Sequence, residues 1–249
     1  MPSSVFADER IILGTTTSVK DSGLIEVIEQ TFEKKHNYKL DVISFGTGQI
    51  LNMATRKDLD IIIVHHENSE KNFMDKGYGI SRHKLMYNYF VLVGPKDDPA
   101  KISDLHNIED AMIKIYNSKS HFVSRSDKSG TNFKEIELWK SAGLDYKEFD
   151  DWYKKIGQGM GATLNFANSI KGYTLTDIST WNFFNKTNNL RIYFDEKANL
   201  INQYNAILID TEEKISSRIF LDWLLSEEGK ILINDYRVYD KKMFYFNGN

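Results

Sequence analysis

The sequence contains no cysteine, which excludes disulfide bonds, thiol catalysis and thiolate metal sites. It has no run near the roughly 20 apolar residues that a membrane-spanning helix needs. Lysine and arginine total 32 and aspartate and glutamate 35, with the two signs interspersed, so the composition argues against a nucleic-acid partner. Residues 1–7 have neither a basic start nor a long apolar core, so no signal peptide is expected here; a secreted chain whose signal has been removed would begin in the same way.

Proline is also scarce, and two of the three prolines fall in the stretch 94–99, which indicates a break in organisation. The 249 residues, 41% of them hydrophobic, are enough for one large core or two lobes. Apolar strand patterns alternate with helical spacing, which predicts an α/β fold with a mainly parallel sheet covered on both faces. Ligands bind beyond the carboxyl ends of the strands in such sheets. The strands expected in the first part of the chain are 11–13, 39–44, 61–64 and 87–93.

A cluster of hydroxyl residues, Thr15–Ser18, follows the apolar run Ile11–Leu13 and precedes helical spacing from Leu24 to Phe32. The cluster is therefore expected where a strand leads into a helix. The free backbone N–H groups and the positive dipole end of a first helical turn bind anions, and hydroxyls add further donors. The alternative is an ordinary Ser/Thr helix cap.

The same design occurs again at residues 121–131, where a strand and a polar turn containing Arg125 precede another helix start at Ser129–Thr131. Two such units suggest two lobes that face each other across a cleft and hold a ligand from both sides. A tetrahedral oxyanion has four oxygens that each accept about two hydrogen bonds, so one lobe cannot easily saturate it. Closure of two lobes would supply the remaining donors and expel water.

Five motifs in one order resemble the Tup-type tungstate-binding proteins, the solute receptors of bacterial ABC importers. The similarity runs from about Ile11 to Tyr236. The resemblance implies a type II periplasmic-binding-protein fold, with two α/β lobes joined by a two-crossing hinge and the ligand in the cleft. Lobe 1 would comprise residues 1–90 and 205–249, and lobe 2 residues 91–204. The motifs are Gly14–Ser18 with Asp21–Leu24, Phe45–Gly48, Tyr87–Pro99, Ser124–Thr131 and Tyr173–Asp177.

The resemblance implies a binding protein, without catalytic residues or a cofactor, that delivers tungstate to a membrane permease. Molybdate is a second candidate ligand. A periplasmic monomer without membrane insertion is expected. A phosphate or sulfate receptor of the same fold is the nearest alternative, but phosphate receptors place an aspartate where this chain reads Val64–Glu67. A bilobal phosphate-handling enzyme is an alternative of another class, although the sequence has no Gly-x-Ser-x-Gly elbow and no Walker loop.

The expected ligands are hydroxyls and backbone amides at the helix starts, together with one arginine that supplies the formal positive charge. Asp127 is expected to hold Arg125 in a fixed orientation. His65 and Thr174 are additional candidates. The main candidates are Thr16, Thr17, Ser18, Thr47, Arg125, Ser129, Gly130 and Thr131.

Each candidate also has a structural alternative. Arg125 and Asp127 would form a surface salt bridge, the Thr47 hydroxyl would be satisfied by its own backbone, and Thr174–Asp177 would be a helix cap. The pair His65-His66 suggests a metal site, but adjacent residues on an extended strand point to opposite faces. No metal site is therefore expected.

Overall fold

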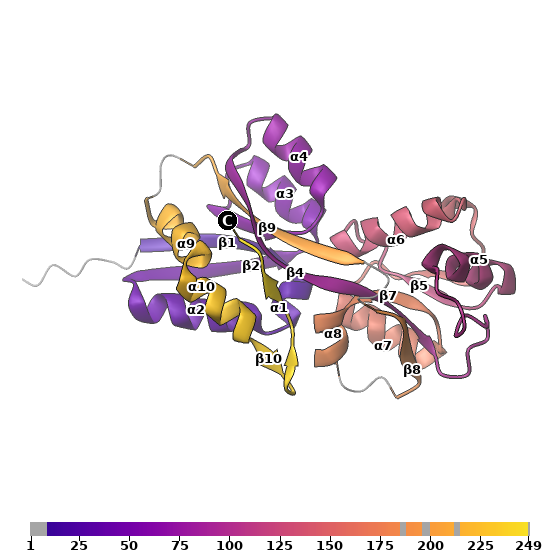
Figure 1. The fold of residues 1–249 in the computed structure, drawn as a ribbon. Helices are drawn as coiled ribbons and strands as arrows, with labels where there is room; N and C mark the ends of the chain where they lie inside the picture. The colour runs from indigo at the N-terminus through magenta and orange to yellow at the C-terminus, as the bar shows by residue number, and fades with distance from the viewer. Residues whose placement is uncertain (1–8, 185–187, 196–199, 212–214, 249) are drawn as a thin grey trace, which may run out of the picture. The chain divides into compact units, whose positions relative to one another are not determined.

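The computed structural model describes residues 9–184, 188–195, 200–211 and 215–248. The chain divides into two units (Figure 1). Unit 1 comprises Met1–Met86, Gln203–Tyr236 and Phe244–Asn249, and unit 2 comprises Tyr87–Asn202 and Arg237–Met243. Two long strands, β4 (Gly79–Pro95) and β9 (Ile201–Ile209), each contribute residues to both units.

The sheet of unit 1 has the strand order β12-β4-β9-β3-β1-β2. Strand β1 pairs in parallel with β2, with Thr16 opposite Phe45, and in parallel with β3, with Thr15 opposite Ile63. Strand β3 pairs antiparallel with β9. The strands not yet delimited are β1 (Glu9–Thr16), β2 (Tyr38–Phe45), β3 (Ile61–Val64) and β12 (Tyr245–Phe246).

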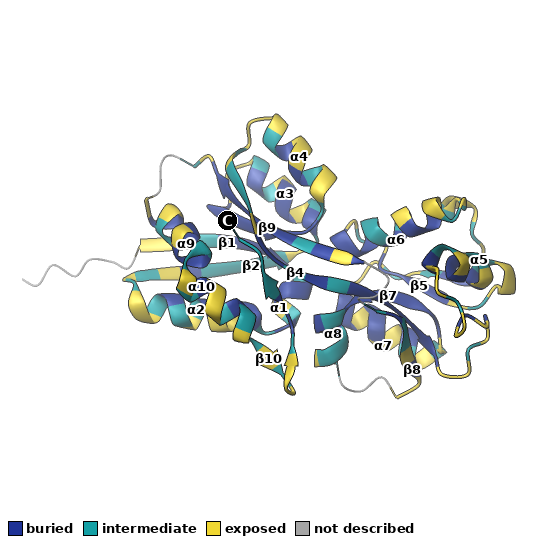
Figure 2. Ribbon diagram, viewed as in Figure 1, coloured by how far each residue is buried: buried dark blue, intermediate teal, exposed yellow. Residues whose placement is uncertain are grey.

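Helices pack on both faces of this sheet. Side chains of α3 and α4 share a core with β3 and β9, whereas on the opposite side Phe32 of α2 packs against Phe220 of α9, with ring centroids 4.8 Å apart. Figure 2 shows the matching alternation of buried and exposed sides on these helices. The helices of unit 1 are α1 (Thr17–Asp21), α2 (Leu24–Lys35), α3 (Thr47–Thr55), α4 (Glu67–Asp75), α9 (Ile215–Leu225) and α10 (Glu227–Asp235).

In unit 2, the second half of β4 pairs antiparallel with both β7 and β8, and β5 pairs in parallel with β6. Phe122 of β5 packs edge-on against Trp139 of α6, within a core that also contains Trp152. The main elements are α5 (Ile108–Ser118), β5 (Phe122–Ser124), α6 (Gly130–Ser141), β6 (Tyr153–Lys155), α7 (Met160–Ile170), β7 (Thr174–Asp177), α8 (Ile178–Phe183) and β8 (Leu190–Phe194). The short elements are a 3₁₀ turn at Tyr146–Glu148, β10 (Arg237–Val238) and β11 (Lys241–Lys242).

The α/β class is confirmed, but the expectation of a mainly parallel sheet is wrong. Strand β9 is antiparallel to β3, and β7 and β8 are antiparallel to β4. An apolar run shows that a strand is buried and carries no information about its direction, so periodicity could not reveal this.

The helix expected from Leu24 to Phe32 is confirmed as α2, which begins at Leu24 and ends at Lys35. A separate helix, α1, lies between β1 and the helix expected from Leu24, and Gly23 in the left-handed conformation (φ 80°) separates the two. The helix expected from Glu212 is described from Ile215 onward, so its first three residues lie outside the described part.

Candidate functional site

The carboxyl ends of three neighbouring strands in unit 1 bring three candidate segments together. Thr16 ends β1 opposite Phe45, the last residue of β2, and Gly46 then caps α3 at Thr47. His65 directly follows β3, whose Ile63 lies opposite Thr15. Parallel pairing therefore brings the starts of α1 and α3 and the His65 turn to one edge of the sheet, as the sequence predicts.

The hydroxyl cluster at the end of β1 is almost wholly buried. Thr16 is the N-cap of α1 in an extended conformation, and its Oγ1 lies 3.1 Å from Oγ of Ser18. Ser18 Oγ also lies 3.5 Å from the hydroxyl of Tyr204. Thr17, the first residue of α1, is only half-buried. These hydroxyls contact one another, so their hydrogens can reorient toward an acceptor without breaking backbone structure.

Thr47 has a buried hydroxyl at the first position of α3. The residue is 0% exposed, and Oγ1 has no hydrogen-bond partner within the described part of the chain. The alternative that its own backbone satisfies this hydroxyl therefore does not hold there. Leaving a buried hydroxyl without a partner costs about 1–3 kcal/mol, a cost that a bound acceptor would remove.

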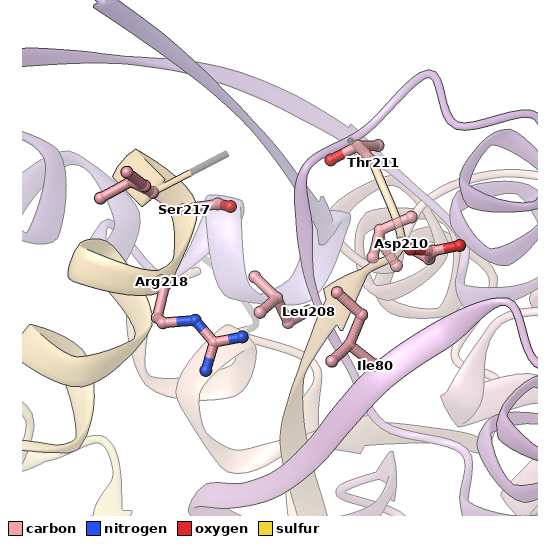
Figure 3. A pocket seen from close by; sticks show the side chains of 8 residues that line it. Ile80, Leu208, Asp210, Thr211, Ser217 and Arg218 are labelled. Carbon is pink, nitrogen blue, oxygen red and sulfur yellow. The ribbon is translucent and has the colours of Figure 1, made fainter. Parts of the chain in front are cut away.

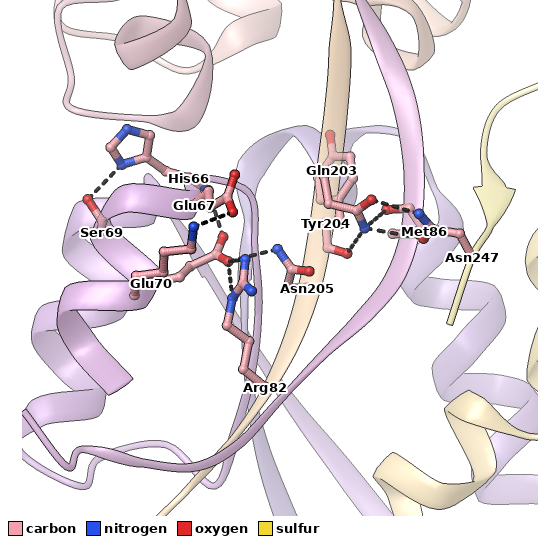
Figure 4. Close-up of polar contacts among 11 residues, drawn as sticks. His66, Glu67, Ser69, Glu70, Arg82, Met86, Gln203, Tyr204, Asn205 and Asn247 are labelled. Carbon is pink, nitrogen blue, oxygen red and sulfur yellow. Dashed lines mark hydrogen bonds and ion pairs between the residues drawn. The ribbon is translucent and has the colours of Figure 1, made fainter. Parts of the chain in front are cut away.

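The turn after β3 is fixed by aromatic stacking and by a buried ion pair. The ring of His65 stacks on Tyr204 with centroids 4.7 Å apart. The backbone N–H of His66 donates to Glu70, which also accepts from Arg82 and Asn205 (Figure 4). Burial raises the pKa of Glu70 although Arg82 lies beside it.

The arginine of the second motif is buried in unit 2. Arg125 is 2% exposed, and its Nη2 donates to Oδ2 of Asp127 at 2.6 Å. The pair is therefore not the surface salt bridge of the alternative interpretation. Ser126 and Lys128 have positive φ angles of 50° and 58°, which curl the loop so that Asp127 faces back toward Arg125.

The same aspartate and the start of α6 complete the loop. Oδ1 of Asp127 accepts the backbone N–H of Ser129 at 3.1 Å, and Ser129 caps α6 by accepting from Asn132 N. Gly130 and Thr131 are the first residues of α6, and both are buried. Oγ1 of Thr131 has no hydrogen-bond partner among residues that the structure describes, as is true of Thr47.

Thr174 is placed differently. It begins β7, and its hydroxyl donates to the carbonyl of Val123 at 2.8 Å. The hydrogen of this hydroxyl is thus already engaged. The residue that caps the next helix is Asp177, whose carboxylate accepts from Thr180 N.

The polar groups collected in each unit are mainly donors. Unit 1 provides hydroxyls and helix starts, and unit 2 provides a guanidinium, hydroxyls and a helix start. The one carboxylate in the second loop, Asp127, accepts from Arg125 and Ser129 with its two oxygens. Such a donor set suits an anion that carries no proton.

A cavity of about 440 Å³ in unit 1 is a separate feature (Figure 3). Four of its eight lining residues are isoleucine or leucine and the other four are polar or charged, among them Asp210 and Arg218, and it contains none of the expected site residues. In the described ranges, no group of three or more His, Asp or Glu side chains is arranged to hold a metal ion. No helix found in those ranges has the length and apolar character to cross a membrane.

Comparison with known proteins identifies the family. The family model described as the PBP superfamily domain matches residues 6–228. The tungstate-binding protein TupA of Peptoclostridium acidaminophilum is 38% identical over 233 residues, which cover 91% of this chain and 81% of the relative.

Two solved structures have the same fold over nearly the whole chain. The tungstate ABC transporter structure from Geobacter sulfurreducens has a TM-score of 0.81 and 40% identity and covers 92% of this chain and 99% of its own. TupA from Desulfovibrio alaskensis G20 has a TM-score of 0.80 and 34% identity, and the match covers 97% of this chain and 100% of that TupA chain. This chain therefore belongs to the TupA family of tungstate-binding proteins within the periplasmic-binding-protein superfamily.

Proposed function

We propose that this protein binds tungstate as an intact, unprotonated dianion and delivers it to the membrane permease of an ABC importer, working in the periplasm as a monomer. The names of the relatives support the ligand and the transport role. The same relatives are binding proteins, which supports a role without catalysis. The proposal needs no cofactor, because donors alone retain the ion.

The observation that carries the proposal is that the polar groups at the helix starts of both units are mainly hydrogen-bond donors. Thr47 and Thr131 each hold a buried hydroxyl without a partner in the described structure, and Arg125 supplies a buried positive charge. Tungstate and molybdate are unprotonated near neutral pH and accept hydrogen bonds only. Phosphate keeps a proton there and needs an acceptor, whereas the one carboxylate of the second loop, Asp127, accepts from Arg125 and Ser129.

We further propose that the candidates of both units serve one ion. Thr16, Thr17, Ser18 and Thr47 would donate from unit 1, and Arg125, Ser129, Gly130 and Thr131 from unit 2. His65 is an additional donor in this proposal. Four oxygens with about eight acceptor positions match such a combined set better than they match either group alone.

Competitive calorimetric titration tests the proposal. Tungstate is titrated into the protein alone and then in the presence of molybdate, sulfate or phosphate. We expect tungstate to bind tightly, molybdate to compete because its size and charge are almost the same, and sulfate and phosphate to compete weakly. Tight phosphate binding, or no heat with tungstate, would refute the proposed function.

A further inference from the structure

Glu135 is a fully buried carboxylate next to the loop of residues 125–129 in unit 2, which is called the oxyanion loop below. It lies on α6, five residues after the helix begins at Gly130, and is 2% exposed. The helical spacing of Phe133, Ile136 and Trp139 predicts a different buried stripe, but the structure buries Glu135 with Leu138 and Trp139 and leaves Phe133 and Ile136 half-buried. A carboxylate in this position needs partners, because burying an unpaired charge is costly.

Donors surround both oxygens of Glu135. Oε2 accepts from the hydroxyl of Ser124 at 2.7 Å, and Oε1 accepts from Trp139 Nε1 at 3.1 Å and from the hydroxyl of Tyr153. No ion pair of the described residues includes Glu135. The carboxylate is therefore solvated by neutral groups alone.

A chain of hydrogen bonds connects Glu135 to the loop that holds the arginine. Ser124 is the last residue of β5 and immediately precedes Arg125. The side-chain amide of Asn132 donates to Ser124 Oγ at 3.4 Å, and its Oδ1 accepts the backbone N–H of Lys128 at 3.2 Å. A change at Glu135 therefore reaches the Arg125 end of the loop through one hydrogen bond, to Ser124, and the Lys128 end through three.

Burial brings the pKa of the Glu135 carboxyl close to neutral pH, so its protonation changes in that range. Burial raises the pKa of Glu135 to about 7, an effect that its hydrogen bonds reduce but do not cancel. Among the side chains bonded to Glu135, Tyr153 is the titratable one, and its phenol has a pKa raised far above its usual range by burial and by Glu135. The charged pair Arg125 and Asp127 lies beyond Ser124.

We propose that Glu135 is a positioning residue for the oxyanion loop, and that it takes up a proton when the oxyanion binds. This inference rests on the proposed function. A dianion bound next to the loop disfavours a second buried negative charge, so the neutral form of Glu135 is favoured in the complex. By reciprocity, protonation of Glu135 strengthens oxyanion binding.

The hydrogen bond between Glu135 and Ser124 explains how protonation of Glu135 can affect the oxyanion loop. The ionised carboxylate accepts the Ser124 hydrogen, which cannot then be donated elsewhere. The neutral carboxyl instead donates its own hydrogen to Ser124 Oγ, which leaves the Ser124 hydroxyl hydrogen available beside Arg125. Proton uptake thus adds a hydroxyl donor at Ser124, directly before Arg125 in the chain.

Calorimetry of tungstate binding to the full chain measures the proton directly. Titrations at about pH 7 in buffers with different ionisation enthalpies give the number of protons taken up, and titrations from about pH 6 to about pH 8 give the affinity profile. We expect net uptake and about three- to tenfold tighter binding at the acid end, because one linked proton changes Kd by at most tenfold per pH unit.

Two variants separate positioning from a purely structural role. Glu135→Gln is a neutral isostere and should bind tungstate without proton uptake and with a flattened pH profile. Glu137→Gln alters an exposed glutamate on the same helix and should keep the uptake and profile of the parent protein. If Glu135→Gln does not fold, infrared difference spectra of the parent protein provide the test, because tungstate should produce the band of a protonated carboxyl group.

The possible outcomes are distinguishable. No tungstate binding by the parent protein refutes the proposed function itself. Tungstate binding without proton uptake, or without the carboxyl band, overturns the inference about Glu135 alone. Proton uptake that persists in Glu135→Gln would belong to another group, such as His65, and would equally overturn the inference about Glu135.

Discussion

At the scale of single residues, two threonines hold buried hydroxyls that are left without a partner in the part of the chain that the structure describes. Thr47 begins α3 and Thr131 is near the start of α6, and neither hydroxyl has a partner in the described structure. A group that costs stability in the free protein is retained where a ligand needs it. Such residues can be separated experimentally from those that support the fold.

We expect Thr47→Val to leave the free protein equally stable, or more stable by up to about 1 kcal/mol, because the lost hydroxyl has no hydrogen-bond partner among the described residues. The same change should weaken tungstate binding about 10- to 100-fold, since one hydrogen bond to a charged group is lost. Denaturant unfolding and calorimetry measure the two effects.

Thr163 offers a matched control on α7. Its buried hydroxyl donates to the carbonyl of Gly159 at 2.9 Å. Thr163→Val should therefore cost about 1 kcal/mol of stability and leave tungstate affinity unchanged. If Thr47→Val destabilised the free protein as much and bound normally, Thr47 would be a structural residue.

Arg125→Ala should weaken tungstate binding at least about 100-fold, because the ion loses its formal countercharge. The single change also leaves the half-buried Asp127 without its cation, and this carboxylate would itself repel a dianion. The double variant Arg125→Ala/Asp127→Asn removes that repulsion and should still bind weakly. Normal affinity of the double variant, measured by calorimetry, would remove Arg125 from the site.

At the scale of elements, sequence patterns located the loops and missed what supports them. The strand, hydroxyl and helix-start order identified residues 15–18 and 129–131, because local chemistry determines where a helix begins. Strand direction was not predictable, because apolar runs carry no sense of direction. Tyr204 and Glu135 were missed because their partners, His65 and Ser124, are separated from them in the sequence and become neighbours only through sheet pairing and helix packing.

Helix α6 follows the oxyanion loop and carries the buried Glu135 five residues after its start. The raised pKa of Glu135 makes the stability of the protein depend on pH. The folded protein holds the pKa of Glu135 at about 7, against an ordinary value of 4.5. Between these two values the folded chain keeps a proton that the unfolded chain releases. The contribution of Glu135 to stability therefore falls as pH rises through this window, by on the order of 3 kcal/mol.

Unfolding in denaturant at about pH 5 and about pH 8 measures this loss in the ligand-free protein. We expect Glu135→Gln to lack most of the decrease, because an amide does not titrate in this range. The exposed Glu137→Gln variant should show the decrease of the parent protein. Equal pH dependence in the parent protein and Glu135→Gln would mean that Glu135 titrates normally in the folded state.

At the scale of the whole molecule, each unit carries its own group of donors, and the question is whether they serve one ion or two. Unit 1 contributes hydroxyls without a formal cation, and unit 2 contributes Arg125 with a second helix start. A tetrahedral dianion accepts about eight hydrogen bonds, which favours the proposal that the donors of both units serve one ion. We therefore expect calorimetry to show one tungstate per chain.

The variants Thr47→Val in unit 1 and Arg125→Ala in unit 2 turn this expectation into a test. If one ion contacts both residues, each single change weakens the same binding event, and the double variant shows a coupling that differs from simple addition. If each unit had its own site, the parent protein would bind two ions, and each single variant would keep one site of full affinity. That second result would contradict a shared ion while leaving tungstate binding itself intact.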